Sequence, residues 1–201
     1  LPWQSIVRDL LYAHRPGTRE FPARPNRRMP GINSALAQAG LPQAYLGSTR
    51  RAQFHANVVI DNSGSMEPDL SKAFGVVREA AETFRDYRVR LITCDTTVHE
   101  DVCYDSRRQR IPVRGFTTHG MGGSDLTPAF RRLVDQRELP ADAVTLVVTD
   151  GMVTVPERHP NAANTYWLLT APHQSAPATW GGIIRMEHDG ARLERPGGAT
   201  A

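Results

Sequence analysis

The amino-acid sequence predicts an α/β protein whose mostly parallel sheet is covered by helices on both faces. Short apolar runs rich in β-branched residues, such as 56–60 and 144–149, are typical of strands buried on both faces. Segments with helical spacing of apolar residues lie between such runs, and this alternation indicates a parallel sheet. Apolar residues make up 40% and charged residues 22% of the 201 residues, which is ordinary for a globular protein and excludes wholesale disorder.

Composition excludes two further classes of protein. The two cysteines, Cys94 and Cys103, can form at most one bridge, which is too few for a disulfide-stapled scaffold. The longest apolar stretches, such as 144–148, are far shorter than the roughly 20 residues that span a membrane. We therefore expect a soluble, cytoplasmic protein. Because the chain begins with Leu1 rather than Met, we also expect it to be part of a larger protein.

Charge is distributed unevenly along the chain. Residues 1–51 hold eight arginines against two acidic residues, a formal charge of +6, whereas the other 150 residues carry −3. Apolar spacing predicts an amphipathic helix over 3–11, packed on the body, and the prolines and glycines of 17–31 argue against regular structure. The first 50 residues are thus expected to form this helix and a basic extended arm. The arm either binds nucleic acid, or is solvated or docked on the acidic body.

The remaining chain divides into a body, 51–188, and a flexible tail, 189–201. The expected strands of the body are 56–60, 89–94, 98–104, 144–149, 165–169 and 183–186, with 111–116 as a further strand or the second half of a hairpin. The expected helices are 67–86 and 127–137. Ligands of such sheets bind beyond the carboxyl ends of the strands, where the strand order reverses.

Polar residues gather just after two of these strands and in a glycine-rich segment between them. They are Asp61, Ser63 and Ser65 after the first strand, Ser124 in the segment GGSD, and Asp150 after the strand 144–149. Carboxylates and hydroxyls without a nearby thiolate or imidazole are hard oxygen ligands, which favour Mg²⁺, Mn²⁺ or Ca²⁺ over zinc. Because neutral hydroxyls offset little of the cation's charge, an acidic group from a protein partner is a suitable final ligand. Two nearby carboxylates, Asp95 and Asp125, are interpreted as caps or supporting groups.

The pattern resembles the metal-ion-dependent adhesion site of von Willebrand factor A (VWA) domains. That family has D-x-S-x-S, then a threonine or serine after two glycines, then an aspartate in a T/S-D-G segment. Asp61, Ser63 and Ser65 match the first motif, Ser124 the second and Asp150 the third. The three serines are expected to bind the cation directly, while the two aspartates hold water molecules and orient the serines.

The resemblance covers about 54–187 and implies a doubly wound, six-stranded sheet with the order 3-2-1-4-5-6. That order places Asp61 and Asp150 side by side. Position 124 carries serine where the family more often has threonine, and Thr127 is a rival for the same role.

Three further segments resemble a narrower group. PNRRM, Cys94-Asp95-Thr96 and TWGGIIRM are similar to the VWA-like C-terminal domain of predicted bacterial metallopeptidase-like proteins. Those proteins carry an upstream domain with an H-E-x-x-H zinc motif, and their relatives accompany MoxR-type AAA+ ATPases. The sequence contains no H-E-x-x-H, so any peptidase activity is expected to lie outside these residues.

We therefore expect a divalent-cation-dependent protein-protein interaction module, working in a bacterial peptidase-like or AAA+ ATPase-associated assembly, rather than an enzyme. A metal-dependent hydrolase or phosphatase with Asp61 as its nucleophile is the alternative, although such sites usually carry a second aspartate where this chain has Ser63. Nucleic-acid binding through the basic arm is a third interpretation.

Overall fold

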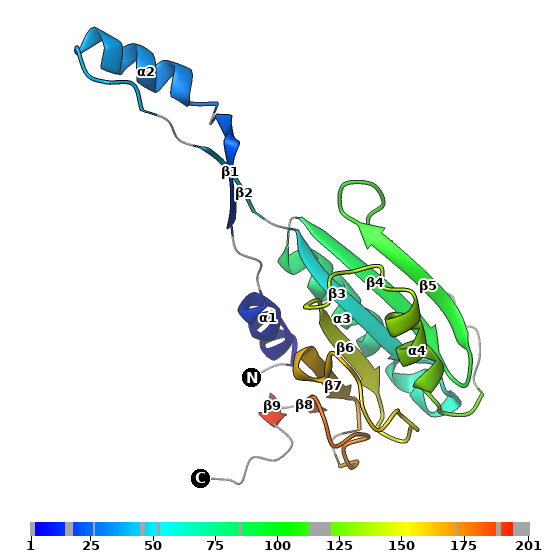
Figure 1. Ribbon diagram of the computed structural model, residues 1–201. Coiled ribbons are helices and arrows are strands. Elements are labelled where there is room, and N and C mark those ends of the chain that lie inside the picture. The colour runs from blue at the N-terminus through cyan, green and yellow to red at the C-terminus, as the bar shows by residue number, and fades with distance from the viewer. Residues whose placement is uncertain are drawn as a thin grey trace. The chain divides into compact units, whose positions relative to one another are not determined.

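The computed structural model describes residues 3–14, 18–25, 27–44, 47–51, 53–84, 86–112, 122–171, 173–187 and 190–194. The chain forms two compact units, one made of 1–14 with 54–201 and the other of 15–53 (Figure 1). The larger unit contains all five candidate metal-site residues.

A seven-stranded sheet with the order β5-β4-β3-β6-β7-β8-β9 forms the larger unit. Its strands are β3 (Phe54–Asp61), β4 (Tyr87–Cys94), β5 (Val98–Asp105), β6 (Val144–Thr149), β7 (Thr165–Leu169), β8 (Gly182–Glu187) and β9 (Gly190–Glu194). The four pairs from β4 to β8 are parallel, whereas β5 and β9 are antiparallel edge strands. The doubly wound, mostly parallel fold and the predicted order of the first six strands are confirmed, and the order reverses between β3 and β6.

The seventh strand, β9, contradicts the prediction of a flexible tail from residue 189. Residues 190–194 pair antiparallel with 183–187 of β8. An edge strand needs main-chain hydrogen bonds to only one neighbour, so the short segment GARLE, without β-branched or aromatic residues, carries little sequence signal. The rest of the predicted tail, 195–201, lies outside the described residues.

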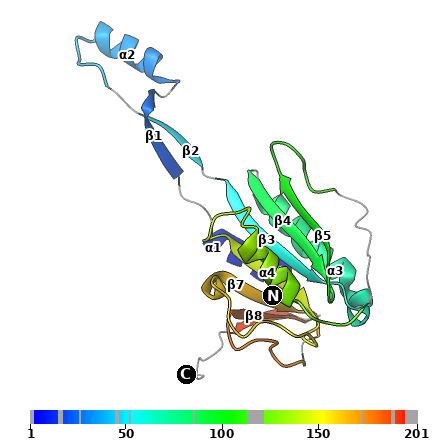
Figure 2. The same cartoon turned by 45° about the vertical axis from the view of Figure 1, so that its right-hand side comes forward.

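Helices cover both faces of the sheet, as predicted (Figure 2). They are α1 (Trp3–Ala13), α3 (Leu70–Thr83) and α4 (Thr127–Asp135), with 3-10 helices η1 (Gly64–Asp69) and η2 (Ala162–Asn164). In β3, Val58 and Ile60 are buried in one core with α1 and α3, whereas Val59 is buried in a second core with α4. Because both faces are covered, β3 is apolar at consecutive positions rather than at alternate ones.

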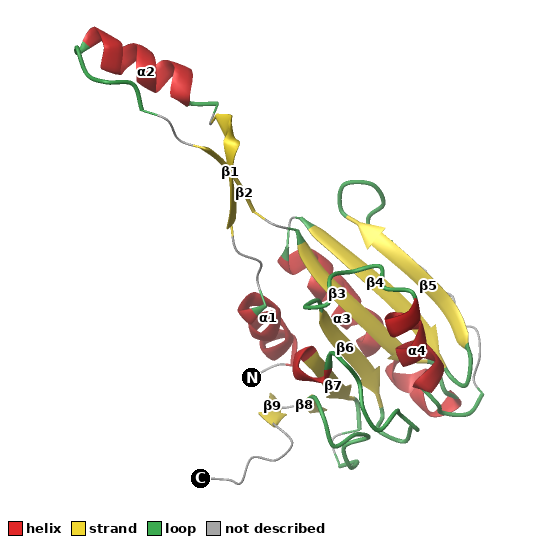
Figure 3. Cartoon of the chain, viewed as in Figure 1, coloured by secondary structure: helices red, strands yellow, loops and turns green. Residues whose placement is uncertain are grey.

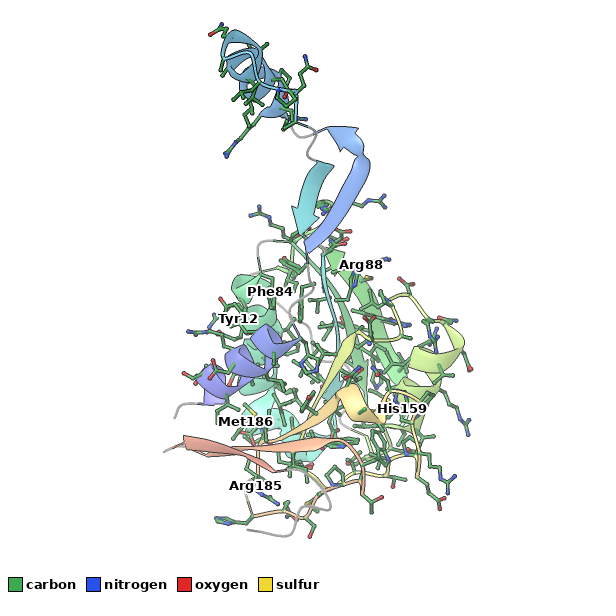
Figure 4. The ribbon with its side chains drawn as sticks, turned by 60° about the vertical axis from the view of Figure 1, so that its left-hand side comes forward. Tyr12, Phe84, Arg88, His159, Arg185 and Met186 are labelled. Atoms are coloured by element: carbon green, nitrogen blue, oxygen red, sulfur yellow. The ribbon has the colours of Figure 1, made fainter. Side chains whose placement is uncertain are left out.

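The first helix packs on the body, as its amphipathic spacing predicts. Its Val7 and Leu11 are fully buried, and Arg8 Nε donates to Glu79 Oε1 of α3 at 2.7 Å. Tyr12 contacts the ring of Phe84, just beyond α3, with ring centroids 5.7 Å apart (Figure 4). This helix therefore belongs to the larger unit.

Two predicted elements differ from the structure in extent. The α-helix predicted from residue 67 begins at Leu70, because the 3-10 helix η1 occupies the preceding residues. The segment 98–104 pairs antiparallel with β4, so its hairpin partner precedes it (Figure 3). Of the segment 111–116, only 111 and 112 are described, and they are not in a strand.

The smaller unit contains regular structure where an extended arm was predicted. Its elements are β1 (Thr18–Pro25), α2 (Met29–Gln38) and β2 (Gly47–Arg51), with β1 and β2 antiparallel. The prolines occupy positions that tolerate them. Pro30 lies in the first turn of α2, where its missing N–H costs no helical hydrogen bond. Between Phe21 and Pro25 the register of β1 shifts, and prolines are accepted at such irregularities.

Both cysteines are free thiols, which agrees with the prediction that the fold lacks a disulfide framework. Cys94 is fully buried, and burial raises its pKa to about 12, so its thiol is inert. Across the described residues, no helix has the length and apolar character needed to cross a bilayer.

Candidate functional site

The predicted site lies at the carboxyl ends of β3 and β6, which are neighbours in the sheet. Ile60 is in register with Val148, so the next residues, Asp61 and Thr149, are adjacent. The Thr149 hydroxyl donates to Asp61 Oδ2 at 2.7 Å. The structure therefore brings Asp61 to the segment that carries Asp150.

The two serines of the first motif follow Asp61 in a tight loop. Ser63 N donates to Asp61 Oδ1 at 3.0 Å, which turns the chain back toward the carboxylate. The hydroxyl oxygens of Ser63 and Ser65 are 3.2 Å apart. Ser63 is buried and Ser65 is exposed, so the hydroxyl pair reaches from the carboxylate to the surface.

Asp61 is a fully buried carboxylate. Burial raises its pKa above the ordinary value, and the negative charge of Asp150 acts in the same direction. Hydrogen bonds from Thr149 and from the amide and hydroxyl of Ser63 oppose this shift without cancelling it. A cation near Asp61 would oppose this shift and stabilise the ionised form of the carboxylate.

Asp150 is also buried, with 7% of its surface exposed. Its Oδ1 accepts the Met152 amide at 2.8 Å, and Gly151 N donates to the Thr149 hydroxyl at 3.1 Å. Gly151 has φ of +94°, and a Cβ there would lie 3.1 Å from the carbonyl oxygen of Ser175. Only glycine fits this turn without strain, and the turn holds Asp150 at the strand end.

Ser124 is held at the same edge of the sheet by main-chain hydrogen bonds of residues 124 and 125. Asp125 N donates to Asp95 O at 2.6 Å, and Asp95 is the residue that follows β4. On the other side, Ser124 O accepts the Thr154 amide at 2.9 Å, in the loop after β6. The segment is thus fixed to the residues that follow both neighbours of β3.

The five predicted residues are connected in different ways. Asp61, Ser63 and Ser65 are linked by direct hydrogen bonds. Asp150 is joined to them through Thr149, and Ser124 is joined to them through main-chain contacts.

Thr127, the rival hydroxyl, is the first residue of α4, and its amide donates to Asp125 Oδ1 at 2.9 Å. Asp125 thus binds the first amide of α4, although the N-cap residue of this helix is Leu126. We call Asp61, Ser63, Ser65, Thr149 and Asp150 the carboxylate cluster.

Sequence reasoning missed Thr149 as a site residue. The signal was present, since Thr149 is a hydroxyl residue at the last position of an otherwise apolar strand end, next to Asp150. Strand alternation places it on the face of the sheet that also carries Asp61. The hydrogen bond between them depends on the register of β3 and β6, which the sequence alone does not specify.

The donor set fits a hard cation. Among the described residues, no group of three or more His, Cys, Asp and Glu side chains could hold a metal ion, so the arrangement differs from a zinc-type site. The carboxylate cluster instead offers two carboxylates and three hydroxyls, the oxygen chemistry that suits Mg²⁺ and its relatives. Within the described residues, neither Asp61 nor Asp150 forms an ion pair.

A second polar group lies on the same face of the sheet, four residues earlier in β3. Arg90 Nε and Nη2 each donate to a carboxylate oxygen of Asp101 at 2.7 Å, and Nη1 donates to Gln136 O at 2.5 Å. Asn57 Nδ2 donates to the Thr145 hydroxyl at 3.3 Å. We call Asn57, Arg90, Asp101 and Thr145 the paired cluster. A cavity of about 80 Å³ adjoins it, but these side chains already bond to one another.

His159 also lines this cavity. Its Nδ1 accepts the Asn161 amide at 3.2 Å, and its ring packs edge-on to Phe130 and nearly parallel to Trp180. Its buried Nε2 has no hydrogen-bond partner among the described residues, and burial lowers its pKa. The ring is therefore a neutral packing group in an aromatic cluster.

Comparison with known proteins agrees with this architecture. The family described as "VWA-like domain (DUF2201)" matches residues 56–187, which include most of β3, all of β4 to β8 and the five predicted site residues. A search of curated proteins gave no match. VWA-like domains often mediate protein interactions. Because the match covers well over half of the chain, this protein belongs to the VWA-like domain family DUF2201.

Proposed function

We propose that this VWA-like domain binds a protein partner through a divalent cation held at the carboxylate cluster. The observation that carries the proposal is the fully buried Asp61, which lies near the charge of Asp150 and beside the paired hydroxyls of Ser63 and Ser65. Within the described part of the chain these two carboxylates form no ion pair, so their burial is costly, and a bound cation would offset that cost.

Each residue has a distinct role in this proposal. Ser63, Ser65 and Ser124 supply neutral hydroxyl ligands, while Asp61 and Asp150 hold water molecules and orient the serines. The cation supplies positive charge and one coordination position open to the partner. Because hydroxyls offset little of that charge, the partner contributes an Asp or Glu carboxylate. Mg²⁺ is the preferred ion, with Mn²⁺ and Ca²⁺ as alternatives.

Titration calorimetry tests the metal site directly. The wild-type chain is titrated with MgCl₂, MnCl₂ and CaCl₂, beside the double variant Ser63→Ala/Ser65→Ala and the control Ser71→Ala, an exposed serine of α3. We expect saturable binding in the wild type and the control, and binding weaker by about 10-fold or more in the double variant. Absence of binding for all three ions in the wild type would refute the proposal. Separate Ser124→Ala and Thr127→Ala variants identify the third hydroxyl.

The biological setting is proposed from the sequence resemblance. The segments PNRRM, Cys94-Asp95-Thr96 and TWGGIIRM support a bacterial, cytoplasmic assembly with a MoxR-type AAA+ ATPase or a peptidase-like domain. Capture of a MoxR-type ATPase on immobilised protein is expected in Mg²⁺ and not in EDTA, and is expected to be lost in Asp61→Ala. Equal capture under both conditions would exclude a metal-dependent contact.

The hydrolase alternative is disfavoured by Ser63, which stands where such sites usually carry a second aspartate. Turnover of a generic phosphate ester in Mg²⁺ would revive it. Nucleic-acid binding by the basic residues of 15–53 predicts affinity that falls steeply with salt and disappears when these residues are deleted.

A further inference from the structure

We propose that Asp95 is a positioning residue that holds Ser124 at the candidate metal site. This inference rests on the proposed function, and it deepens it by naming the group that sets the geometry of one ligand. Asp95 follows β4 directly and only 4% of its surface is exposed, so its contacts are made in the protein interior rather than in solvent.

The side chain of Asp95 joins two segments that are far apart in the sequence. Its Oδ1 accepts the amides of Thr96 and Thr97, the latter at 2.9 Å, and it lies 2.9 Å from His99 Nε2. Its Oδ2 accepts the Gly122 amide at 3.1 Å. One oxygen therefore organises the turn after β4, while the other reaches across to the segment that carries Ser124.

The main chain of Asp95 binds the same segment a second time. Its carbonyl oxygen accepts the Asp125 amide at 2.6 Å. Ser124 is thus bracketed, because one residue fixes the chain two positions before it and one position after it. Fixing both flanks restricts the direction in which the Ser124 hydroxyl points.

The two glycines before Ser124 are required by this close approach. A Cβ on Gly122 would lie 2.9 Å from Asp95 Oδ2, and one on Gly123 would lie 3.1 Å from Thr96 Cγ2. Any side chain at 122 would therefore push the segment away from the carboxylate. The GG of the second motif thus lets the backbone dock on the turn that Asp95 organises.

Asp95 also connects Ser124 to the first motif. The preceding residue, Cys94, is in register with Asp61, and its carbonyl oxygen accepts the Asn62 amide at 2.8 Å. Residues 94 and 95 therefore contact the main chain next to Asp61 on one side and next to Ser124 on the other. Burial acts to raise the pKa of Asp95, but the amides of Thr97 and Thr96, with His99 and Gly122, outweigh it and lower the pKa. The carboxylate is consequently a stable anionic acceptor.

Two variants of the whole chain separate positioning from general stability. Asp95→Ala removes every side-chain contact. In Asp95→Asn, the amide oxygen can still serve the turn amides, while the amide nitrogen faces Gly122 and cannot accept its N–H. Asn161→Ala is the control, because it deletes a side chain that donates to Ala143 O at 2.7 Å, just before β6 and remote from the carboxyl ends of the strands.

Amide hydrogen exchange by NMR, in metal-free buffer, tests the positioning claim even if the chain binds no metal. Exchange of Gly122 and Asp125 is expected to accelerate by about 10-fold or more in both Asp95 variants, and not in Asn161→Ala. If Asp95→Ala does not fold, Asp95→Asn alone decides the outcome. Unchanged exchange at these two amides in a folded Asp95 variant would overturn the proposal.

Mg²⁺ titration then shows whether Asp95 acts through Ser124. The affinity is expected to fall about 10-fold in Asp95→Asn, as for other groups that orient a ligand. When Ser124→Ala is already present, Asp95→Asn is expected to cause almost no further loss of Mg²⁺ affinity. Additive losses in the double variant would contradict an action through Ser124. A wild type that binds no Mg²⁺ refutes the proposed function and leaves the exchange result to decide the role of Asp95.

Discussion

The paired cluster and the carboxylate cluster lie on the same face of the sheet, four residues apart along β3. Their buried charges differ: one has a partner of opposite charge, and the other lies near a like charge. Arg90, with 1% of its side chain exposed, is matched by both oxygens of Asp101. Asp61 is fully buried as well, but the charge that acts on its pKa is that of another carboxylate, Asp150. A buried charge with an internal partner supports the fold, whereas one without such a partner is suited to an external ion.

The largest effect is expected from breaking the paired cluster. Asp101→Ala leaves the Arg90 guanidinium buried without its carboxylate, and is expected to lower the free energy of unfolding by about 3–5 kcal/mol. Urea denaturation measures this loss. The double variant Arg90→Met/Asp101→Leu should recover much of it, because no buried charge is left unpaired; Arg132, which lies 3.8 Å from Asp101, is exposed to solvent. A loss below about 1 kcal/mol in Asp101→Ala would mean that Arg90 is solvated rather than paired.

Removal of a charge from the carboxylate cluster, unlike removal of one from the paired cluster, is not expected to destabilise the metal-free protein. Asp61→Asn removes a buried negative charge, while its amide can still accept from Ser63 N and donate to the Thr149 hydroxyl. We expect a metal-free variant at least as stable as the wild type, with Mg²⁺ affinity weaker by about 100-fold. Thermal unfolding without metal measures the stability of the variant. Unfolding at a series of MgCl₂ concentrations, each 10-fold above the last, measures its Mg²⁺ affinity. Strong destabilisation of the metal-free variant would assign Asp61 a purely structural role.

A smaller effect is expected at Thr149. Thr149→Val keeps the shape of the side chain but removes the hydroxyl that orients Asp61 Oδ2. Mg²⁺ affinity is expected to fall about 10-fold by calorimetry. Thr145→Val makes the matched change in the paired cluster, on the same strand, and should leave Mg²⁺ affinity unchanged. Equal losses in both variants would show that the two clusters are not independent.

The smallest expected effect is on the pH dependence of stability, through His159 in the cavity beside the paired cluster. Burial lowers the pKa of His159, so below the ordinary histidine pKa the unfolded chain binds a proton more readily than the folded one. The contribution of neutral His159 is therefore complete above about pH 6.5 and declines as the pH falls toward its folded pKa. Urea denaturation at pH 7 and pH 5 should show a smaller difference in His159→Phe than in the wild type. An identical difference in both proteins would show that His159 is solvated when folded.

The sequence predicted the parts of the fold that depend on strong local patterns. The continuous apolar runs of β3 and β6 identify strands buried on both faces, and parallel order then places Asp61 and Asp150 at one edge. The sequence analysis does not predict β9 or the antiparallel pair of β1 and β2, because pairing partners rather than apolar periodicity define these strands. Pro22 and Pro25 were read as excluding structure, although edge positions and register shifts accept proline.

The connections within the candidate site were less predictable than its members. Asp61, Ser63 and Ser65 are linked within five consecutive residues, so their motif determines its own local geometry. The bonds from Thr149 to Asp61 and from Gly122 to Asp95 join residues 88 and 27 positions apart. Such contacts depend on strand register and loop docking, which leave no local signature in a single sequence. Asp95 was therefore predicted only as a cap or supporting group.

The position of α1 has a consequence for the order in which the protein is made. This helix precedes every strand of the sheet along the chain, yet it packs against β8 and β9, the last described strands, as well as against α3. Val7 and Leu11 share a core with Ile184, so during translation part of their apolar surface stays uncovered until β8 has emerged. Residues 15–53 lengthen the loop that must close before α1 docks, at a modest entropic cost. A nascent chain released before β8 would carry a partly exposed apolar helix, the kind of surface that chaperones recognise.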